Sequence, residues 1–305
     1  MDTFLQQVVN GLTVGSFYAL VALGYTMVYG VIRLINFAHG DLYMVGAFAG
    51  FTLLGLLGST LGVGMGHLSP ILLLPLVFLV PMAVVGVLGM VIERVAYRPL
   101  RRAPRLSPLI TAIGVSLALE YGALLLWGSS FQVFPAILPG ALWHLGHVEI
   151  NAMQVLILPL TLALMLALYL FVHRTMLGKA MRAVAVDQDT ARLMGIDVDA
   201  VISWTFFIGG MLAAAAGVMA GAYYSEIDFN MGFLIGLKAF TAAVLGGIGN
   251  IPGAMLGGYI LGLLEALAAG YNSSEWKDVF AFSILIAVLV LRPTGLLGER
   301  VVEKV

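Results

Sequence analysis

The chain has 305 residues, of which 61% are hydrophobic and 10% charged, and its mean hydropathy is +1.03. A soluble domain carries about 25% charged residues, so this composition argues against a soluble enzyme fold and predicts a polytopic all-α membrane protein. The net charge of −1 gives no reason to expect a nucleic-acid partner, and the absence of cysteine excludes disulfides and thiolate metal sites.

Apolar runs long enough to cross a bilayer follow one another along the chain. A bilayer core about 30 Å thick needs roughly 20 apolar residues per helix. Eight runs reach or approach that length; a ninth is shorter and ends in the helix-breaking series GGIGNIPG (246–253), so we expect a short or broken span there. The expected spans, in one transmembrane domain covering 1–305, are 8–32, 42–65, 70–92, 107–127, 152–172, 203–224, 237–249, 251–270 and 279–291.

The positions of the basic residues predict the orientation in the membrane. Lys and Arg concentrate in short cytoplasmic loops, and thirteen of the fifteen basic residues share one side if there are nine crossings. This places the N-terminus outside and the C-terminus in the cytoplasm. Eight crossings would move the N-terminus inside and Arg33 to the wrong face, or would require 237–249 to be re-entrant.

Nine crossings also predict an inverted repeat. The first four and last four spans would enter the membrane from opposite sides, separated by the fifth span. Such repeats commonly enclose a transport path at their interface, with broken helices beside it. The layout therefore favours a transporter.

The longest inner loop, 173–202, has its own helix signals. Asp187 or Asp189 can cap an N-terminus, a short helix would run from Thr190 to Met194, and Gly195 followed by Ile196 is typical of a left-handed C-cap. A short capped helix suits docking to a rigid cytoplasmic partner. A solvated loop with caps and no further role is equally compatible with this pattern.

Four segments carry a resemblance to known permeases. Asp189-Thr190-Ala191, three further residues and Gly195 resemble the EAA-x3-G loop of ATP-binding-cassette importer permeases, whose short helix inserts into a cleft of the ATPase subunit. Nearly the whole chain resembles the LivH-type branched-chain amino acid permease subunits, through three longer segments. They are GLTVGSFYALVALGYTMVYGVIRLINFAHGDLYMVGAF (11–48), ERVAYRPLR (93–101) and KAFTAAVLGGIGNIPGAMLGG (238–258).

The resemblance implies a type II-like permease subunit of an ATP-driven importer in the bacterial inner membrane, in contact with membrane lipid. Its expected partners are a second homologous permease, two ATPase subunits and an extracytoplasmic substrate-binding protein. The expected cargo is a branched-chain amino acid; urea and short-chain amide permeases share much of the pattern. The expected ATPase-coupling residues are Asp187, Asp189, Thr190, Ala191, Arg192, Gly195 and Ile196.

The nucleotide-binding signature G-x4-G-K-[ST] is absent. Its only partial match, Gly178-Lys179, is followed by Ala180 and lacks the upstream glycine. The chain is therefore expected to be no enzyme and to hold no cofactor, with ATP and Mg²⁺ bound by the ATPase subunits. His144 and His147 are spaced like metal ligands but have one acid nearby, so no metal site is expected.

Charged residues inside the spans bear on a competing hypothesis, a stand-alone ion-coupled transporter. Glu120 and Glu265 lie in expected spans and Lys238 begins the broken one. A buried charge is costly and is a functional candidate by default. Because no series of proton-relay residues accompanies them, we favour pairing between helices, with Lys238 neutralising one carboxylate.

Polar groups near the inner membrane face indicate a path or gate. Free backbone groups in the broken region are tolerated only where they are buried in protein or line water. Asn36, His39 and Asp41 cluster after the first span, as a gate or as an ordinary polar turn with Gly40 at its corner. The candidates for the path or gate are Tyr25, Thr26, Asn36, His39, Asp41, Gly247, Gly249 and Asn250.

Overall fold

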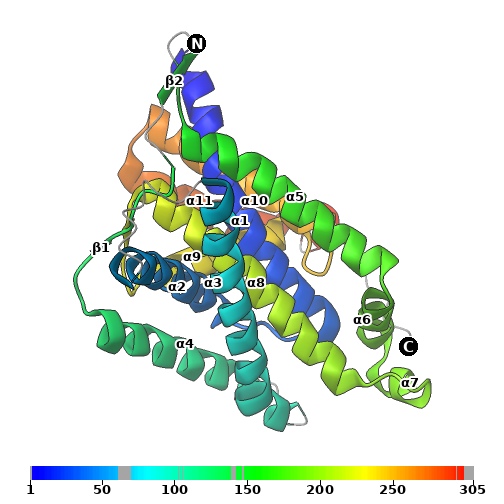
Figure 1. The fold of residues 1–305 in the computed structure, drawn as a ribbon. Coiled ribbons are helices and arrows are strands. Elements are labelled where there is room, and N and C mark those ends of the chain that lie inside the picture. The colour runs from blue at the N-terminus through cyan, green and yellow to red at the C-terminus, as the bar shows by residue number, and fades with distance from the viewer. Residues whose placement is uncertain are drawn as a thin grey trace.

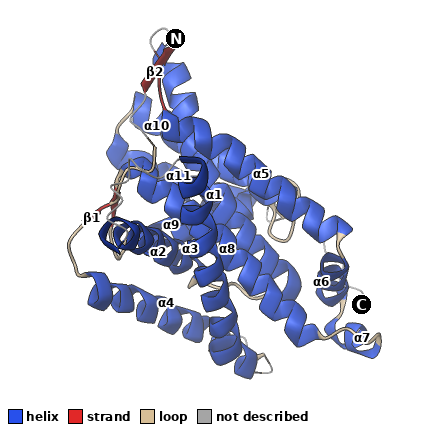
Figure 2. Cartoon of the chain, viewed as in Figure 1, coloured by secondary structure: helices blue, strands red, loops and turns tan. Residues whose placement is uncertain are grey.

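The computed structural model describes residues 2–60, 70–101, 103–104, 106–138, 142–145, 148–292 and 294–298. This part of the chain is almost entirely helical, with short strands in the loops (Figure 2). The helices are α1 (Asp2–Ile32), α2 (His39–Thr60), α3 (Pro70–Ile92), α4 (Leu106–Trp127), α5 (Ala152–Arg174), α6 (Met176–Val186), α7 (Gln188–Leu193), α8 (Val198–Tyr224), α9 (Met231–Gly246), α10 (Ile251–Tyr271) and α11 (Lys277–Leu291).

The all-α membrane fold is confirmed, and each expected span coincides with a helix. Seven helices are long and apolar enough to cross a membrane; α9 and α11 have 16 and 15 residues. The expected short span at 237–249 is an unbroken helix that starts earlier, at Met231, and the break follows it. Residues 61–65 of the second expected span lie outside the described residues. The nine crossings and the inverted repeat stay predictions.

The long inner loop is shorter and more structured than the sequence predicted. α5 runs on to Arg174 and α8 begins at Val198, so most of 173–202 is helix. The sequence did not predict helix α6. Its N-cap is Thr175, whose side chain accepts a hydrogen bond from Gly178 N at 3.1 Å. Its apolar residues Met181 and Val184 are buried and Lys179 is exposed, the periodicity of an amphipathic helix.

Helices α1 and α8 form the centre of the bundle, while α4 stands apart from it (Figure 1). α1 packs on α8, α9 and α10, and most of its side chains are buried. The strands lie in the loops: β1 (Gln132–Val133) pairs with β4 (Glu226–Ile227), and β2 (Leu142–Leu145) with β3 (Val148–Asn151). β2 and the N-terminus lie at the opposite end of the molecule from α6 and α7 (Figure 1).

Small residues let α1 and α10 approach closely. A Cβ added to Gly258 would lie 2.5 Å from the backbone N and Cα of Ala19, and one added to Gly262 would lie 2.4 Å from the Cα of Gly15. Between lipid-embedded helices, packing of this kind replaces the hydrophobic effect as the main attraction. The α1–α10 contact therefore depends on these glycines.

Gly258→Ala is expected to destabilise the protein by about 1–3 kcal/mol, because the methyl group forces α1 and α10 apart. Gly55 of α2 is the matched control, since its added Cβ would meet nothing within 4 Å. Gly55→Ala should be neutral or slightly stabilising. Thermal unfolding of both variants in detergent checks the contrast, and equal melting temperatures would contradict it.

Candidate functional site

Helix α7 is capped at both ends, and of the two N-caps predicted, Asp187 and Asp189, the structure has Asp187. Asp187 is the N-cap: its Oδ1 accepts hydrogen bonds from the backbone N of Asp189 and Thr190 at 2.8 and 2.9 Å. These two bonds hold the pKa of Asp187 below its usual value. The helix therefore begins at Gln188 and ends at Leu193, earlier than the Thr190–Met194 helix predicted.

The C-terminal end of α7 has the left-handed cap predicted from sequence. Gly195 has φ +80°, its N–H donates to Arg192 O at 3.0 Å, and Ile196 N–H donates to Ala191 O at 3.1 Å. Asp197 then caps α8 through Ala200 N at 3.0 Å. The short helix is thus fixed at both ends and joined to α8 by a rigid turn.

The outer surface of α7 carries apolar side chains among charges. Leu193 is 88% exposed and Met194 78%, and Val186 before the helix is 82% exposed. Asp189 and Arg192 lie beside them as an exposed ion pair at 3.2 Å. Exposed apolar residues gathered on a polar segment make this surface a candidate for an interaction with a partner.

Residues 93–101, which we call the bridge segment, connect α3 to the base of α8. The segment begins as a π-helix, Glu93–Tyr97. Glu93 is fully buried, pairs with Arg101 and accepts a hydrogen bond from Ser203 Oγ of α8 at 2.6 Å. Arg101 also pairs with Asp199 in the first turn of α8, Nη1 to Oδ1 at 2.5 Å, and Arg98 pairs with the same carboxylate.

The bridge segment also holds the turn between α1 and α2. Tyr97 donates its hydroxyl to Asn36 Oδ1 at 2.6 Å, and its ring packs 5.4 Å from that of Phe206 on α8. A groove next to the segment is lined by Arg98 and Arg101 and, on α7, by Asp189 and Arg192. One short piece of chain therefore contacts the base of α8 and the α1–α2 turn, and borders a groove shared with α7.

The polar residues predicted after the first span are all buried and lie together. His39 packs its ring on Gly24, where an added Cβ would come within 2.0 Å of Nε2, and its ring centroid is 4.9 Å from that of Tyr25. The backbone N–H of His39 donates to Asn36 O at 3.0 Å. These contacts form a compact junction of α1, α2 and α8 at the α1–α2 turn.

Four polar atoms near this turn are buried without a hydrogen-bond partner in the described part of the chain: Thr26 Oγ1, Asn36 Nδ2, His39 Nε2 and Asp41 Oδ2. Each such atom costs about 1–3 kcal/mol, and native structures keep few of them. Ser116 and Glu120 of α4 interact with Asp41, so Glu120 lies near this turn, while Lys238 pairs with Glu265.

The break between α9 and α10 follows the glycines that predict it. Gly247 and Gly249 have φ of +108° and +96°, and Asn250 caps α10 through Gly253 N at 2.9 Å. Backbone groups at the end of α9 are bonded by the C-terminal segment: Leu296 and Leu297 N–H donate to Leu245 and Gly246 O at 2.9 and 3.0 Å. Asn250 Nδ2 donates to Leu297 O at 2.9 Å. Protein contacts therefore satisfy these groups, a pairing that the sequence did not reveal.

A cluster of charges around the buried Lys238 joins four helices. Lys238 Nζ of α9 lies 2.8 Å from Glu265 Oε1 of α10 and 2.6 Å from Asp278 Oδ1 of α11. Tyr18 of α1 donates its hydroxyl to Glu265 Oε2 at 2.6 Å. Lys238 pairs with Glu265, one of the two carboxylates that the sequence offered it. Asp278 was not predicted as a partner because it stands just before the apolar run of its helix.

The similarity to known proteins extends over the same elements. Residues 7–289, from α1 into α11, match the family described as branched-chain amino acid transport system / permease component. The chain belongs to this family. It is 49% identical to the high-affinity branched-chain amino acid transport system permease protein BraD of Pseudomonas aeruginosa, over 99% of this chain and 98% of the relative.

The identity to the permease protein LivH of Escherichia coli K12 is 48%, with the same shares covered. A probable LivH of Methanocaldococcus jannaschii is 32% identical over 92% of this chain and 88% of the relative. Among solved structures, PsaBC from Streptococcus pneumoniae in complex with Fab aligns with a TM-score of 0.49 at 12% identity, over 95% of this chain and 92% of that chain.

The resemblance to LivH-type subunits is thereby confirmed, and the protein is a multi-pass membrane permease of a transport system. The short helix α7 and the polar cluster at the α1–α2 turn were predicted from the sequence, whereas the buried carboxylate of Glu93 was not. The signal was present, because Glu93 directly follows a 23-residue apolar helix that contains no compensating charge.

Proposed function

We propose that this permease is the membrane subunit of an ATP-driven importer that moves leucine, isoleucine and valine into the cell by alternating access. The observation that carries this proposal is the 48–49% identity, over nearly the full length, to permeases named for high-affinity branched-chain amino acid transport. Uptake of radiolabelled leucine by the complete importer in proteoliposomes tests it. Isoleucine and valine should compete and urea and acetamide should not; the reverse pattern would assign the permease to amides.

The proposed assembly contains a second permease, two ATPase subunits that bind ATP and Mg²⁺, and an extracytoplasmic binding protein. In the bacterial inner membrane the end with α6 and α7 would face the cytoplasm and the N-terminus the outside. The basic residues of α6, α7 and the bridge segment support this orientation. The charge cluster of Lys238 bears on the energy source of transport. Its groups pair with one another, which suits a structural role better than the coupling of transport to an ion gradient.

In this importer α7 would be the element that docks on an ATPase subunit. The support is its double capping and its exposed apolar residues on a charged surface. Leu193→Asp is therefore expected to reduce co-purification of the ATPase subunit roughly tenfold, since it puts a charge where an apolar contact is desolvated. Leu193→Met keeps the apolar contact and is the matched control. Unchanged association of the aspartate variant would move the docking site elsewhere.

The α1–α2 turn is the proposed inner gate. Its buried, unpartnered polar atoms on Thr26, Asn36 and Asp41 would gain water or cargo when α1 separates from its neighbours, which offsets part of the cost of opening. The bridge segment would connect this gate to the docking end, because it holds Asn36 through Tyr97 and the base of α8 through Glu93 and Arg101.

A further inference from the structure

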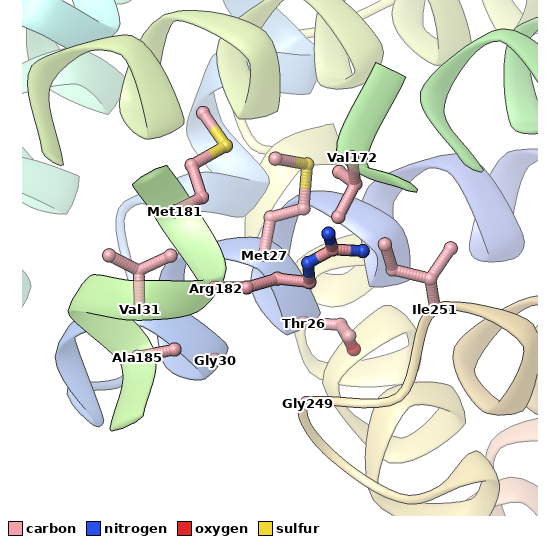
Figure 3. A pocket seen from close by; sticks show the side chains of 10 residues that line it. All are labelled: Thr26, Met27, Gly30, Val31, Val172, Met181, Arg182, Ala185, Gly249 and Ile251. Atoms are coloured by element: carbon pink, nitrogen blue, oxygen red, sulfur yellow. The ribbon is translucent and has the colours of Figure 1, made fainter. Parts of the chain in front are cut away.

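A pocket lies between the inner end of α1, helix α6 and the α9–α10 turn (Figure 3). The pocket itself has a volume of about 100 Å³. It adjoins a second hollow of about 370 Å³ that shares Gly30, Ala185 and Gly249 and reaches Arg33 and Asn250, and this larger hollow is within the roughly 300–1,000 Å³ usual for small-molecule sites. The pocket therefore stands between the proposed gate and the cytoplasmic end of the molecule.

The walls of this pocket are mainly aliphatic, with two polar side chains. Met27 and Val31 come from α1, Val172 from α5 and Met181 from α6. The guanidinium of Arg182 points into the pocket among Thr26, Val172 and Ile251 (Figure 3). No described carboxylate forms an ion pair with Arg182, and Thr26 Oγ1 is buried without a partner in the described chain.

This combination matches the chemistry of an aliphatic α-amino acid. A guanidinium binds a carboxylate through two parallel hydrogen bonds, a hydroxyl oxygen accepts from an ammonium group, and methionine and valine side chains pack against a branched apolar side chain. We propose that the pocket is an inward-facing subsite for the cargo, with Arg182 binding the carboxylate and Thr26 accepting from the ammonium group. The inference rests on the proposed function.

The test is binding of leucine and of leucinamide, which lacks the carboxylate, to the nucleotide-free importer in lipid nanodiscs without its extracytoplasmic binding protein, which would bind leucine itself. The wild type should prefer leucine, and Arg182→Gln should weaken leucine binding roughly tenfold or more while leaving leucinamide binding unchanged. Lys179 and Arg182 are both exposed residues of α6, but only Arg182 lines the pocket. Lys179→Gln therefore removes a positive charge from the same helix and should leave both affinities unchanged. Arg182→Lys should restore part of the preference.

Three results would overturn the subsite. The first is that Arg182→Gln keeps the preference for leucine over leucinamide. The second is that Lys179→Gln loses this preference to the same extent as Arg182→Gln. The third is that the effect of Arg182→Gln vanishes in nanodiscs without anionic lipid, which would assign Arg182 to a lipid phosphate. Co-purification of the ATPase subunits verifies that each variant is folded. Wild-type leucine uptake separates the two proposals, because its absence defeats the proposed function, whereas normal uptake with unchanged binding in Arg182→Gln defeats the subsite alone.

Discussion

Lys238→Met is expected to lower the free energy of unfolding by about 3–5 kcal/mol, as removal of one partner from a buried ion pair typically does. Lys238 is 2% exposed and lies within 2.8 Å of one carboxylate oxygen and 2.6 Å of another. Without it, Glu265 stays buried with only the Tyr18 hydroxyl as a partner, and α9, α10 and α11 lose their common contact. Thermal unfolding of the purified protein measures the loss.

Two variants show whether the loss comes from the unpaired carboxylates. Lys277→Met removes the lysine that precedes Asp278 in α11 and should change stability by less than about 1 kcal/mol, as is usual for partly exposed charges. Lys238→Met combined with Glu265→Gln and Asp278→Asn leaves no charge in the cluster and should regain most of the stability. If Lys238→Met unfolds at the temperature of Lys277→Met, the cluster does not stabilise the bundle.

Tyr97→Phe is expected to reduce the number of leucines imported per ATP hydrolysed roughly tenfold while the ATPase subunits stay bound and active. The substitution removes one hydroxyl, and with it the 2.6 Å hydrogen bond to Asn36 that joins the bridge segment to the α1–α2 turn. A buried hydrogen bond of this kind is worth about 1–3 kcal/mol when one partner is left unpaired, and about 1.4 kcal/mol is a factor of ten in an equilibrium. Proteoliposome uptake and phosphate release, measured together, give the ratio.

Tyr121→Phe is the matched control, since Tyr121 is exposed on α4 and should leave the ratio unchanged. Asn36→Leu should lower the ratio as Tyr97→Phe does. The double variant should be no worse than either single one, because both remove the same interaction. Additive losses, or wild-type coupling in Tyr97→Phe, would mean that movement reaches the α1–α2 turn by another route.

Much of the fold follows from local sequence. Apolar runs predicted helices α1 to α5 and α8 to α11 because, in a membrane, an apolar run of sufficient length has few alternatives to a helix. Short-range sequence patterns also predicted two features correctly. Gly195 and Ile196 form the predicted C-cap of α7, and Gly247 and Gly249 form the break before α10. Helix ends were less certain, since α1 extends over polar residues before its apolar run and α8 begins at its Asp197 cap.

The contacts that define the candidate site were beyond local reasoning. Glu93 meets Ser203 across 110 positions of sequence and Tyr97 meets Asn36 across 61, and no periodicity links such pairs. The same holds for the C-terminal segment, whose Leu297 pairs with Gly246 and Asn250. The sequence showed which residues were costly to bury, while the fold determined which partner each of them found.

The dependence of leucine transport on the ATPase subunits decides between an ATP-driven importer and an ion-coupled transporter. The measurement compares leucine uptake into proteoliposomes by the permease alone and by the complete importer, each with and without ATP and with an imposed proton or sodium gradient. We expect uptake only by the complete importer with ATP, regardless of the gradient. Leucine uptake by the permease alone, driven by either gradient, would contradict it.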